Sequence, residues 1–89
     1  MSLILIVEDN DKNLKLVRDV LQVKGYNTIE AGSAEDGIAL AGEHKPDLIL
    51  MDIQLPGMDG LTLTRRLKAD SATCDIIIVA LRAYSETVW

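Results

Sequence analysis

Short apolar runs alternate with amphipathic segments along the whole chain. Four of these runs have the length of a β-strand, and continuous apolar runs of this length are typical of strands that are buried in a parallel sheet. We expect these strands over residues 3–7, 26–30, 47–51 and 75–81. The second run contains more polar residues than the others, which is typical of a strand at the edge of a sheet.

The segments between the first three runs predict two helices. Over residues 11–24, apolar residues recur at the spacing of one helix face, and Gly25 provides a C-terminal stop. Ser33 predicts the N-cap of a second helix that runs to about residue 43. Pro46 then prevents the helix from continuing into the third strand.

Residues 52–60 contain one proline and two glycines and therefore predict a loop. A third helix is expected over residues 59–69, with Leu61, Leu63 and Leu67 buried in part. The alternation of strands and helices predicts an α/β fold with a doubly wound parallel sheet. The strand order 2-1-3-4 is common for such a sheet.

Composition limits the possible functions. The 89 residues are expected to form one domain over residues 1–89. The net charge of −5 opposes direct binding to nucleic acid. The sequence lacks an apolar run of about 20 residues, and it opens with neither a basic segment nor a signal-peptide cleavage site. We therefore expect no membrane span and a cytoplasmic location.

Carboxylates follow two of the predicted strands. Glu8 and Asp9 follow the first strand, and Asp52 follows the third. In the order 2-1-3-4 these strands are neighbours, so we expect the three acids to share one crevice at the carboxyl edge of the sheet. Each pair would repel by about 3 kcal/mol at a separation of ~5 Å, and a bound cation would relieve that repulsion.

Oxygen ligands without histidine or cysteine favour Mg²⁺ as the cation. A carboxylate beside such an ion can attack a phosphoryl group, which indicates aspartyl phosphorylation. A single acid after a strand more often turns the chain or caps a helix. The convergence of three acids is what favours a metal site over that simpler interpretation.

The residues around these acids also carry a resemblance to a known family. Residues 6–10 read Ile-Val-Glu-Asp-Asn, and residues 46–60 read Pro-Asp-Leu-Ile-Leu-Met-Asp-Ile-Gln-Leu-Pro-Gly-Met-Asp-Gly. Both segments resemble the receiver domain of bacterial two-component response regulators, in particular single-domain cell-cycle regulators of the DivK type. The resemblance extends over essentially the whole chain and implies the flavodoxin-like fold of CheY.

The resemblance also implies a role for each acid. Asp52 would be the phospho-acceptor, Asp9 a direct ligand of Mg²⁺, and Glu8 a ligand that acts through water. The backbone carbonyl of Gln54 would be a further ligand. The phosphoryl donor would be a phosphohistidine on a partner histidine kinase or phosphotransfer protein.

The sequence departs from the family pattern at its C-terminal end. Arg82 stands where the family has a serine or threonine that contacts the phosphoryl group. The family's lysine and switch aromatic of the fifth strand have no counterpart, because the sequence stops after the fourth predicted strand. We therefore expect the fifth βα unit to be missing. We also expect self-association through the edge of the fourth strand or the uncovered face of the sheet.

Three functions remain open at this point. The first is a phosphorelay receiver that accepts phosphate on Asp52. The second is an interaction or dimerisation module that works without phosphorylation, because the switch residues are absent. The third, a Mg²⁺-dependent enzyme with an aspartyl-phosphate intermediate, is the weakest, because Gln54 cannot serve as a general acid two residues after Asp52. We therefore predict that the protein is not an enzyme.

Overall fold

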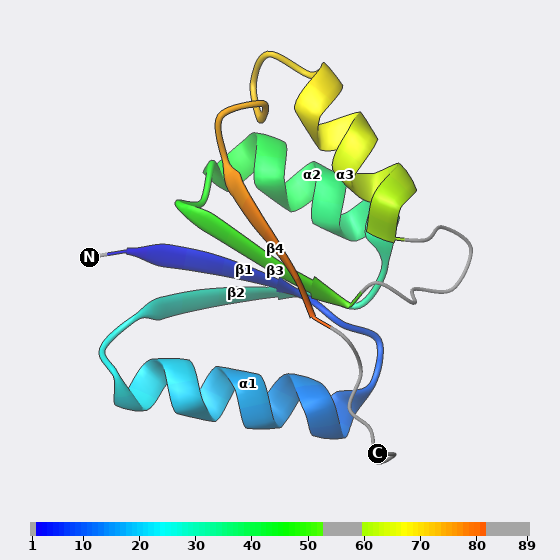
Figure 1. The fold of residues 1–89 in the computed structure, drawn as a ribbon. Coiled ribbons are helices and arrows are strands. Elements are labelled where there is room, and N and C mark those ends of the chain that lie inside the picture. Colours follow the sequence, from blue (N-terminus) through cyan, green and yellow to red (C-terminus); the bar gives the residue numbers. More distant parts are fainter. Residues whose placement is uncertain (1, 53–59, 82–89) are drawn as a thin grey trace.

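A computed structural model describes residues 2–52 and 60–81 of the chain. Within these residues, strands and helices alternate (Figure 1) in the order β1 (Leu3–Val7), α1 (Asp11–Val23), β2 (Asn27–Ala31), α2 (Ala34–His44), β3 (Leu48–Asp52), α3 (Gly60–Ala69) and β4 (Ile77–Leu81). The strands form one sheet in the order β2-β1-β3-β4, and every pair is parallel. The predicted fold class and strand order are both confirmed.

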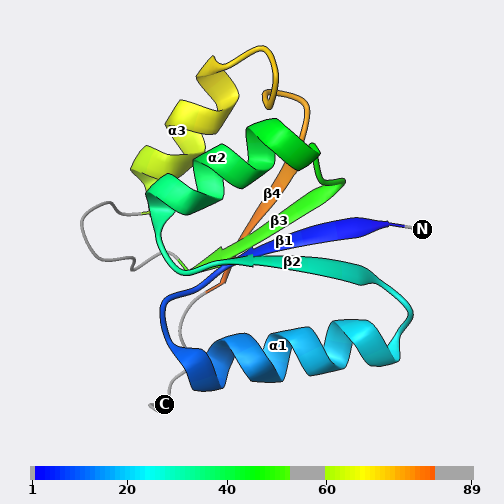
Figure 2. The same cartoon turned by 180° about the vertical axis from the view of Figure 1, so that it is seen from behind.

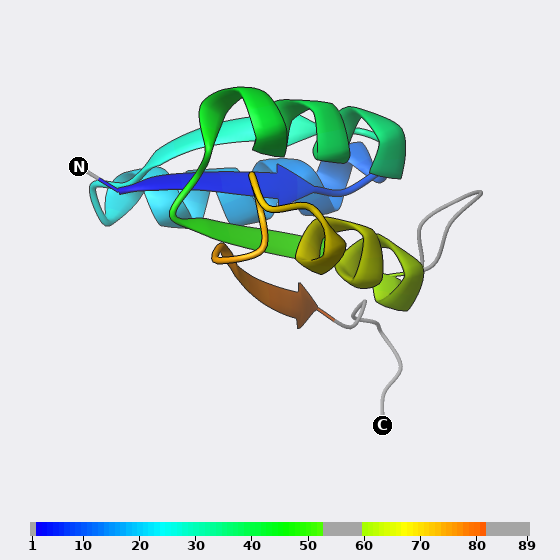
Figure 3. The same ribbon diagram turned by 90° about the horizontal axis from the view of Figure 1, so that it is seen from above.

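The helices divide between the two faces of the sheet. Helices α2 and α3 lie on one face, and α1 lies on the other (Figures 1 and 2). Seen from above, α1 lies behind β1 and β2, whereas β4 lies to one side of α1 and is not backed by it (Figure 3). None of the described helices combines the length with the apolar character that crossing a lipid bilayer requires.

The hydrophobic core lies between the sheet and the α2–α3 layer. Because side chains alternate along a strand, every second residue of β1 and β3 points into this layer. The core combines these strand residues with leucines of α3 and small residues of α2: Leu5, Val7, Ile49, Met51, Leu63, Leu67, Ala34 and Ala41. Each of these side chains is almost completely buried.

The opposite face is covered only in part. Ile4 and Ile6 of β1 are buried, but in the same cross-strand rows Ile77 of β4 is 63% exposed and Val79 is 40% exposed. A groove of about 400 Å³ lies on this side, and it is lined mainly by apolar side chains, among them Ile4, Leu21, Tyr26, Leu48, Leu50 and Ile77. The described residues therefore leave apolar surface exposed beside α1.

The second strand begins one residue later than predicted, and it ends one residue later, at Ala31. The cause is the way in which α1 ends. Gly25 has a φ of 92°, a conformation that glycine adopts without a steric penalty, and its N–H donates to the carbonyl of Gln22. The N–H of Tyr26 donates to the carbonyl of Leu21, 3.1 Å away, so it completes the helix end instead of joining the sheet.

The second helix agrees with its predicted cap. Ser33 accepts a hydrogen bond from the backbone N–H of Asp36 at 3.2 Å, which confirms it as the N-cap. The helix ends at His44, one residue beyond the prediction. Lys45 follows in the left-handed conformation, with a φ of 48°, and Pro46 then prevents any continuation.

The fourth strand begins at Ile77, two residues later than predicted. Residues 70–76 form a turn that follows α3, in which the Thr73 hydroxyl donates to the carbonyl of Leu67 at 2.6 Å. The Lys68 ammonium group donates to the carbonyl of Ile76 at 2.8 Å. Ile76 is therefore part of the turn, although its apolar side chain resembles those of the strand.

The third helix corrects one prediction about burial. Leu63 and Leu67 are buried, but Leu61 is 70% exposed. Residues two positions apart on an α-helix lie about 200° apart around its axis, so Leu61 cannot face the sheet when Leu63 does. The expected burial of Leu61 was therefore wrong.

Candidate functional site

Three carboxylates lie at the carboxyl end of the two central strands. Glu8 and Asp9 follow β1 directly, and Asp52 is the last residue of β3. Because β1 and β3 are parallel neighbours, in register at Val7 and Met51, the three acids start from adjacent backbone positions. Asp52 therefore belongs to the strand and not to the following loop, in which the sequence had placed it.

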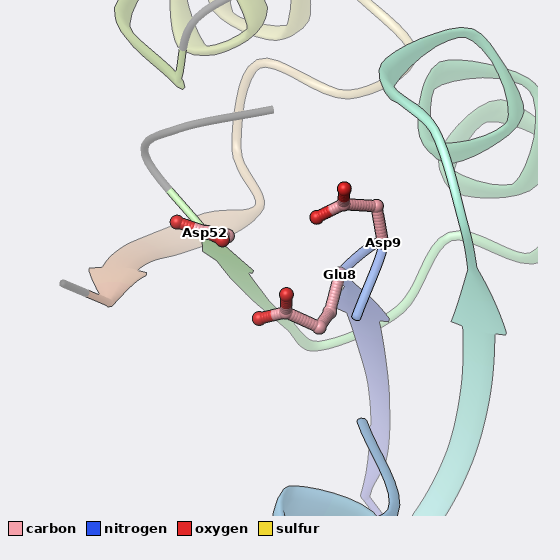
Figure 4. Close-up of side chains that lie close together, drawn as sticks. All are labelled: Glu8, Asp9 and Asp52. Carbon is pink, nitrogen blue, oxygen red and sulfur yellow. The ribbon is translucent and has the colours of Figure 1, made fainter. Parts of the chain in front are cut away.

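The side chains of these acids converge. One carboxylate oxygen from each of Glu8, Asp9 and Asp52 lies within 4.8 Å of the other two. Figure 4 shows the three side chains close together at the strand ends. Glu8 is 6% exposed and Asp52 is 7% exposed, whereas Asp9 is open to solvent. The acids share one crevice, as we expected from the strand order.

Asn10 organises the connection between β1 and α1. Its side-chain oxygen accepts hydrogen bonds from the backbone N–H groups of Lys12 and Asn13, at 2.9 and 3.0 Å, so it is the N-cap of the helix. Its own backbone N–H donates to the Glu8 carboxylate at 3.2 Å. The sequence prediction missed this role of Asn10, although an asparagine directly before a helical pattern is a cap signal.

The electrostatics of the crevice are unfavourable for three charged acids. Burial is the largest of the effects that raise the pKa of Glu8 above its ordinary value of 4.5. The hydrogen bond from Asn10 opposes this effect, and the neighbouring Asp52 and Asp9 carboxyls raise the pKa further. The crevice therefore favours a state in which a proton or a cation reduces its negative charge.

Comparison with known families identifies the domain. Residues 4–88 match the model of the response regulator receiver domain, which is nearly the whole chain. The chain belongs to the receiver domain family. A receiver domain works in two-component phosphorelay signalling, so this function is favoured over an interaction module that is independent of phosphorylation.

Relatives and solved structures agree with this assignment. The polar-differentiation response regulator DivK of Brucella ovis is 48% identical over 82 residues, which are 92% of this chain and 67% of the relative. The N-terminal domain of a response regulator receiver protein from Methanoculleus marisnigri has a TM-score of 0.90 at 34% identity, over 98% of this chain and 71% of that one. The receiver domain is thus DivK-like in sequence.

A third relative has a solved structure that contains a metal ion. The receiver domain of the sensor histidine kinase PA1611 from Pseudomonas aeruginosa has magnesium coordinated in its active-site cleft. It has a TM-score of 0.84 at 32% identity, over 89% of this chain and 65% of that one.

The donor atoms of this receiver domain suit Mg²⁺. The group consists of three carboxylates and contains neither histidine nor cysteine, and hard oxygen ligands are those that Mg²⁺ prefers. Two of the acids are buried together, which is unfavourable for their charged forms unless a cation accompanies them. The residues present therefore fit the ion.

Two of the predicted site residues lie outside the described residues. They are Gln54, the expected carbonyl ligand, and Arg82, at the position of the family's serine or threonine. Both assignments stay predictions that follow from the resemblance.

Proposed function

We propose that this receiver domain accepts a phosphoryl group on Asp52 from a phosphohistidine of a histidine kinase or phosphotransfer protein. The observation that carries the proposal is the convergence of three carboxylates within 4.8 Å at the ends of neighbouring strands. Such a cluster is unfavourable unless a cation neutralises it, and a carboxylate beside a cation is a suitable acceptor for a phosphoryl group.

The transfer would be a displacement at phosphorus. A carboxylate oxygen of Asp52 forms a bond to phosphorus, and the bond from phosphorus to the donor nitrogen breaks. The histidine nitrogen keeps that electron pair and takes up a proton. Asp52 is the last residue of the central strand β3 and pairs with Leu81 of β4, which supports this role because strand pairing holds its backbone position.

Glu8, Asp9 and Asp52 would hold Mg²⁺, with the Gln54 carbonyl as a further ligand. When bound, Mg²⁺ offsets the negative charge of the carboxylates and of the phosphoryl oxygens. Asn10 supports the site because its backbone N–H donates to Glu8 and its side chain caps α1. The magnesium ion in the PA1611 receiver domain also supports this assignment.

A cytoplasmic location for the domain stays a prediction from the sequence. We also infer that the domain is a phosphoryl acceptor within a relay and not an enzyme with a separate turnover substrate. Steady release of product from phosphate esters would contradict this inference.

The proposed acceptor can be tested with acetyl phosphate, a small phosphodonor, in the presence of Mg²⁺. We expect intact-mass measurements to detect one phosphoryl group on the wild type and none on the Asp52→Asn variant. Asp36→Asn is a matched control, because Asp36 is exposed in the first turn of α2 and should leave labelling unchanged. Equal labelling of Asp52→Asn and the wild type would exclude Asp52 as the acceptor.

We also propose that two copies of the chain associate through β4 and the exposed face beside it. β4 is an edge strand among the described residues, and its sequence, Ile-Ile-Val-Ala-Leu, has none of the charges that usually protect such an edge. Ile77 and Val79 continue this apolar surface onto the face of the sheet. A second copy provides both an unpaired edge and a matching apolar face.

Light scattering across a concentration series tests this association. We expect a concentration-dependent dimer for the wild type and a monomer for Ile77→Lys. The dimer should strengthen with added salt, because salt screens the net charge of −5 on each copy. Leu61→Lys is the control, since it introduces the same charge at an exposed leucine of α3. A wild-type monomer at all concentrations would refute the proposed association.

A further inference from the structure

Gly37 of α2 packs directly against Val7, the last residue of β1. A Cβ atom at position 37 would lie 3.0 Å from Val7 Cγ2 and 3.4 Å from Val7 Cγ1. The first distance is shorter than an ordinary van der Waals contact between carbon atoms, and the second is at the lower limit of such contacts. A Cβ atom at Gly42, in the same helix, would have no such neighbour within 4 Å. The absence of a side chain thus matters at position 37 and not at position 42.

Val7 has little freedom to move away from a methyl group at position 37. Its side chain is branched at Cβ, which restricts rotation about χ1, and it is almost fully buried in the core. Its backbone pairs with Ala31 of β2 on one side and with Met51 of β3 on the other. A displacement of Val7 would therefore be passed to the backbone of the central strands.

Val7 is the last residue of β1, directly before the end of the sheet at which the three carboxylates lie. It precedes Glu8 and Asp9 in the chain, and its partner Met51 precedes Asp52. A shift of a few tenths of an ångström at Val7 would change the separation of ligands that come from two different strands. We propose that Gly37 is a positioning residue: the close contact of α2 with β1 that it permits sets the relative placement of the carboxylates that bind Mg²⁺.

This inference rests on the proposed function, because it needs Mg²⁺ to bind at the carboxylates. Mg²⁺ binding by the wild type, measured by titration calorimetry, is therefore the reference. If the wild type binds no Mg²⁺, the proposed function fails. If the wild type binds and the variants at position 37 behave like it, only the inference about Gly37 fails.

The experiment compares Gly37→Ala with Gly42→Ala. Both variants replace a glycine of α2 with alanine, which by itself favours the helix. We expect Gly37→Ala to weaken Mg²⁺ binding by about tenfold, the lower end of the roughly 10–100-fold loss that follows when the support of metal ligands is disturbed. Gly42→Ala should bind Mg²⁺ as the wild type does.

A double variant separates positioning from a general effect on folding. Val7→Ala removes both Cγ atoms that lie close to position 37 and leaves Val7 Cβ at 3.8 Å, an ordinary contact distance. In Gly37→Ala/Val7→Ala the clash is therefore absent, and we expect Mg²⁺ affinity to return to within about twofold of the wild type. This recovery should occur even though the loss of a buried valine lowers the stability of the double variant.

Two results would overturn the inference. The first is a Gly37→Ala variant that folds and binds Mg²⁺ with wild-type affinity. The second is a double variant that folds, as shown by circular dichroism, but binds Mg²⁺ as weakly as Gly37→Ala. If Gly37→Ala does not fold, the double variant decides the question: wild-type affinity supports the role of Gly37, and weakened affinity refutes it.

Discussion

The two faces of the sheet differ in how their helices are attached. On one face, α2 and α3 cover the strands, and α2 alone buries Ala34, Gly37 and Ala41. On the other face, α1 has no fully buried residue, and it is held partly by polar contacts. One of them is the ion pair between Arg18 and Glu30 of β2, at 2.9 Å.

Two of the three acids, Glu8 and Asp52, belong to the less covered side. Asp52 follows Leu48 and Leu50 on the same face of β3, because side chains alternate along a strand, and Glu8 follows Ile4 and Ile6 in the same way along β1. The α2–α3 face therefore supplies most of the packing, and the α1 face carries buried charge and exposed apolar surface. The packing of the covered face therefore offsets the local cost of burying Glu8 and Asp52 at the strand ends.

The largest effect should come from removing a side chain on the covered face. Leu63→Ala should lower the free energy of unfolding by about 2–5 kcal/mol, because it leaves a cavity in the core. Leu61→Ala, in the same helix but exposed, should change it by less than about 0.5 kcal/mol. Urea denaturation measures both values. Equal losses in the two variants would contradict the assignment of the core to this face.

A smaller effect is expected at the cap of α1. Asn10→Ala should lower the free energy of unfolding by about 1 kcal/mol and speed amide hydrogen exchange along α1, which lacks buried anchors. Ser33→Ala removes the matching cap of α2, where buried residues should limit faster exchange to the first turn. An equal rise in exchange along both helices would contradict the conclusion that buried residues anchor α2 but not α1.

The smallest effect should be a pH dependence at Glu8 without metal. The folded protein holds the Glu8 proton more tightly than the unfolded chain does, because the pKa is raised from 4.5. The contribution of Glu8 to stability is therefore fully present below pH 4.5 and is lost as the pH rises through the folded-state pKa.

The matching experiment uses urea denaturation in the presence of a chelator. Relative to the wild type, Glu8→Gln should gain stability as the pH rises from about 4.5 toward neutral, because the amide that replaces the carboxylate carries no charge to bury. Glu43→Gln is the control, since Glu43 is exposed at the end of α2. A pH profile of Glu8→Gln that runs parallel to that of the wild type would contradict the raised pKa.

Much of this arrangement could be predicted from local sequence. The apolar run of β1, the stop at Gly25 and the cap at Ser33 are governed by neighbouring residues, so the order of the elements could be derived directly. The grouping of Glu8, Asp9 and Asp52 followed once the strand order was assumed, because parallel strands end at the same edge of the sheet.

Other features depend on contacts between segments that are distant in sequence. The burial of Leu63 and the exposure of Leu61 depend on which side of α3 meets the sheet. The late start of β4 depends on the bonds that Lys68 and Thr73 form in the preceding turn. The role of Gly37 depends on its distance to Val7, which a sequence pattern does not report.

The proposed receiver function depends most on the three carboxylates acting as one Mg²⁺ site. Titration calorimetry at neutral pH should detect one Mg²⁺ bound by the wild type. Asp9→Asn should abolish that binding or weaken it at least tenfold, and its stability should change little, because Asp9 is exposed. Asp36→Asn, an exposed change outside the cluster, should bind as the wild type does. Equal Mg²⁺ affinity in Asp9→Asn and the wild type, or no binding by the wild type, would contradict the account.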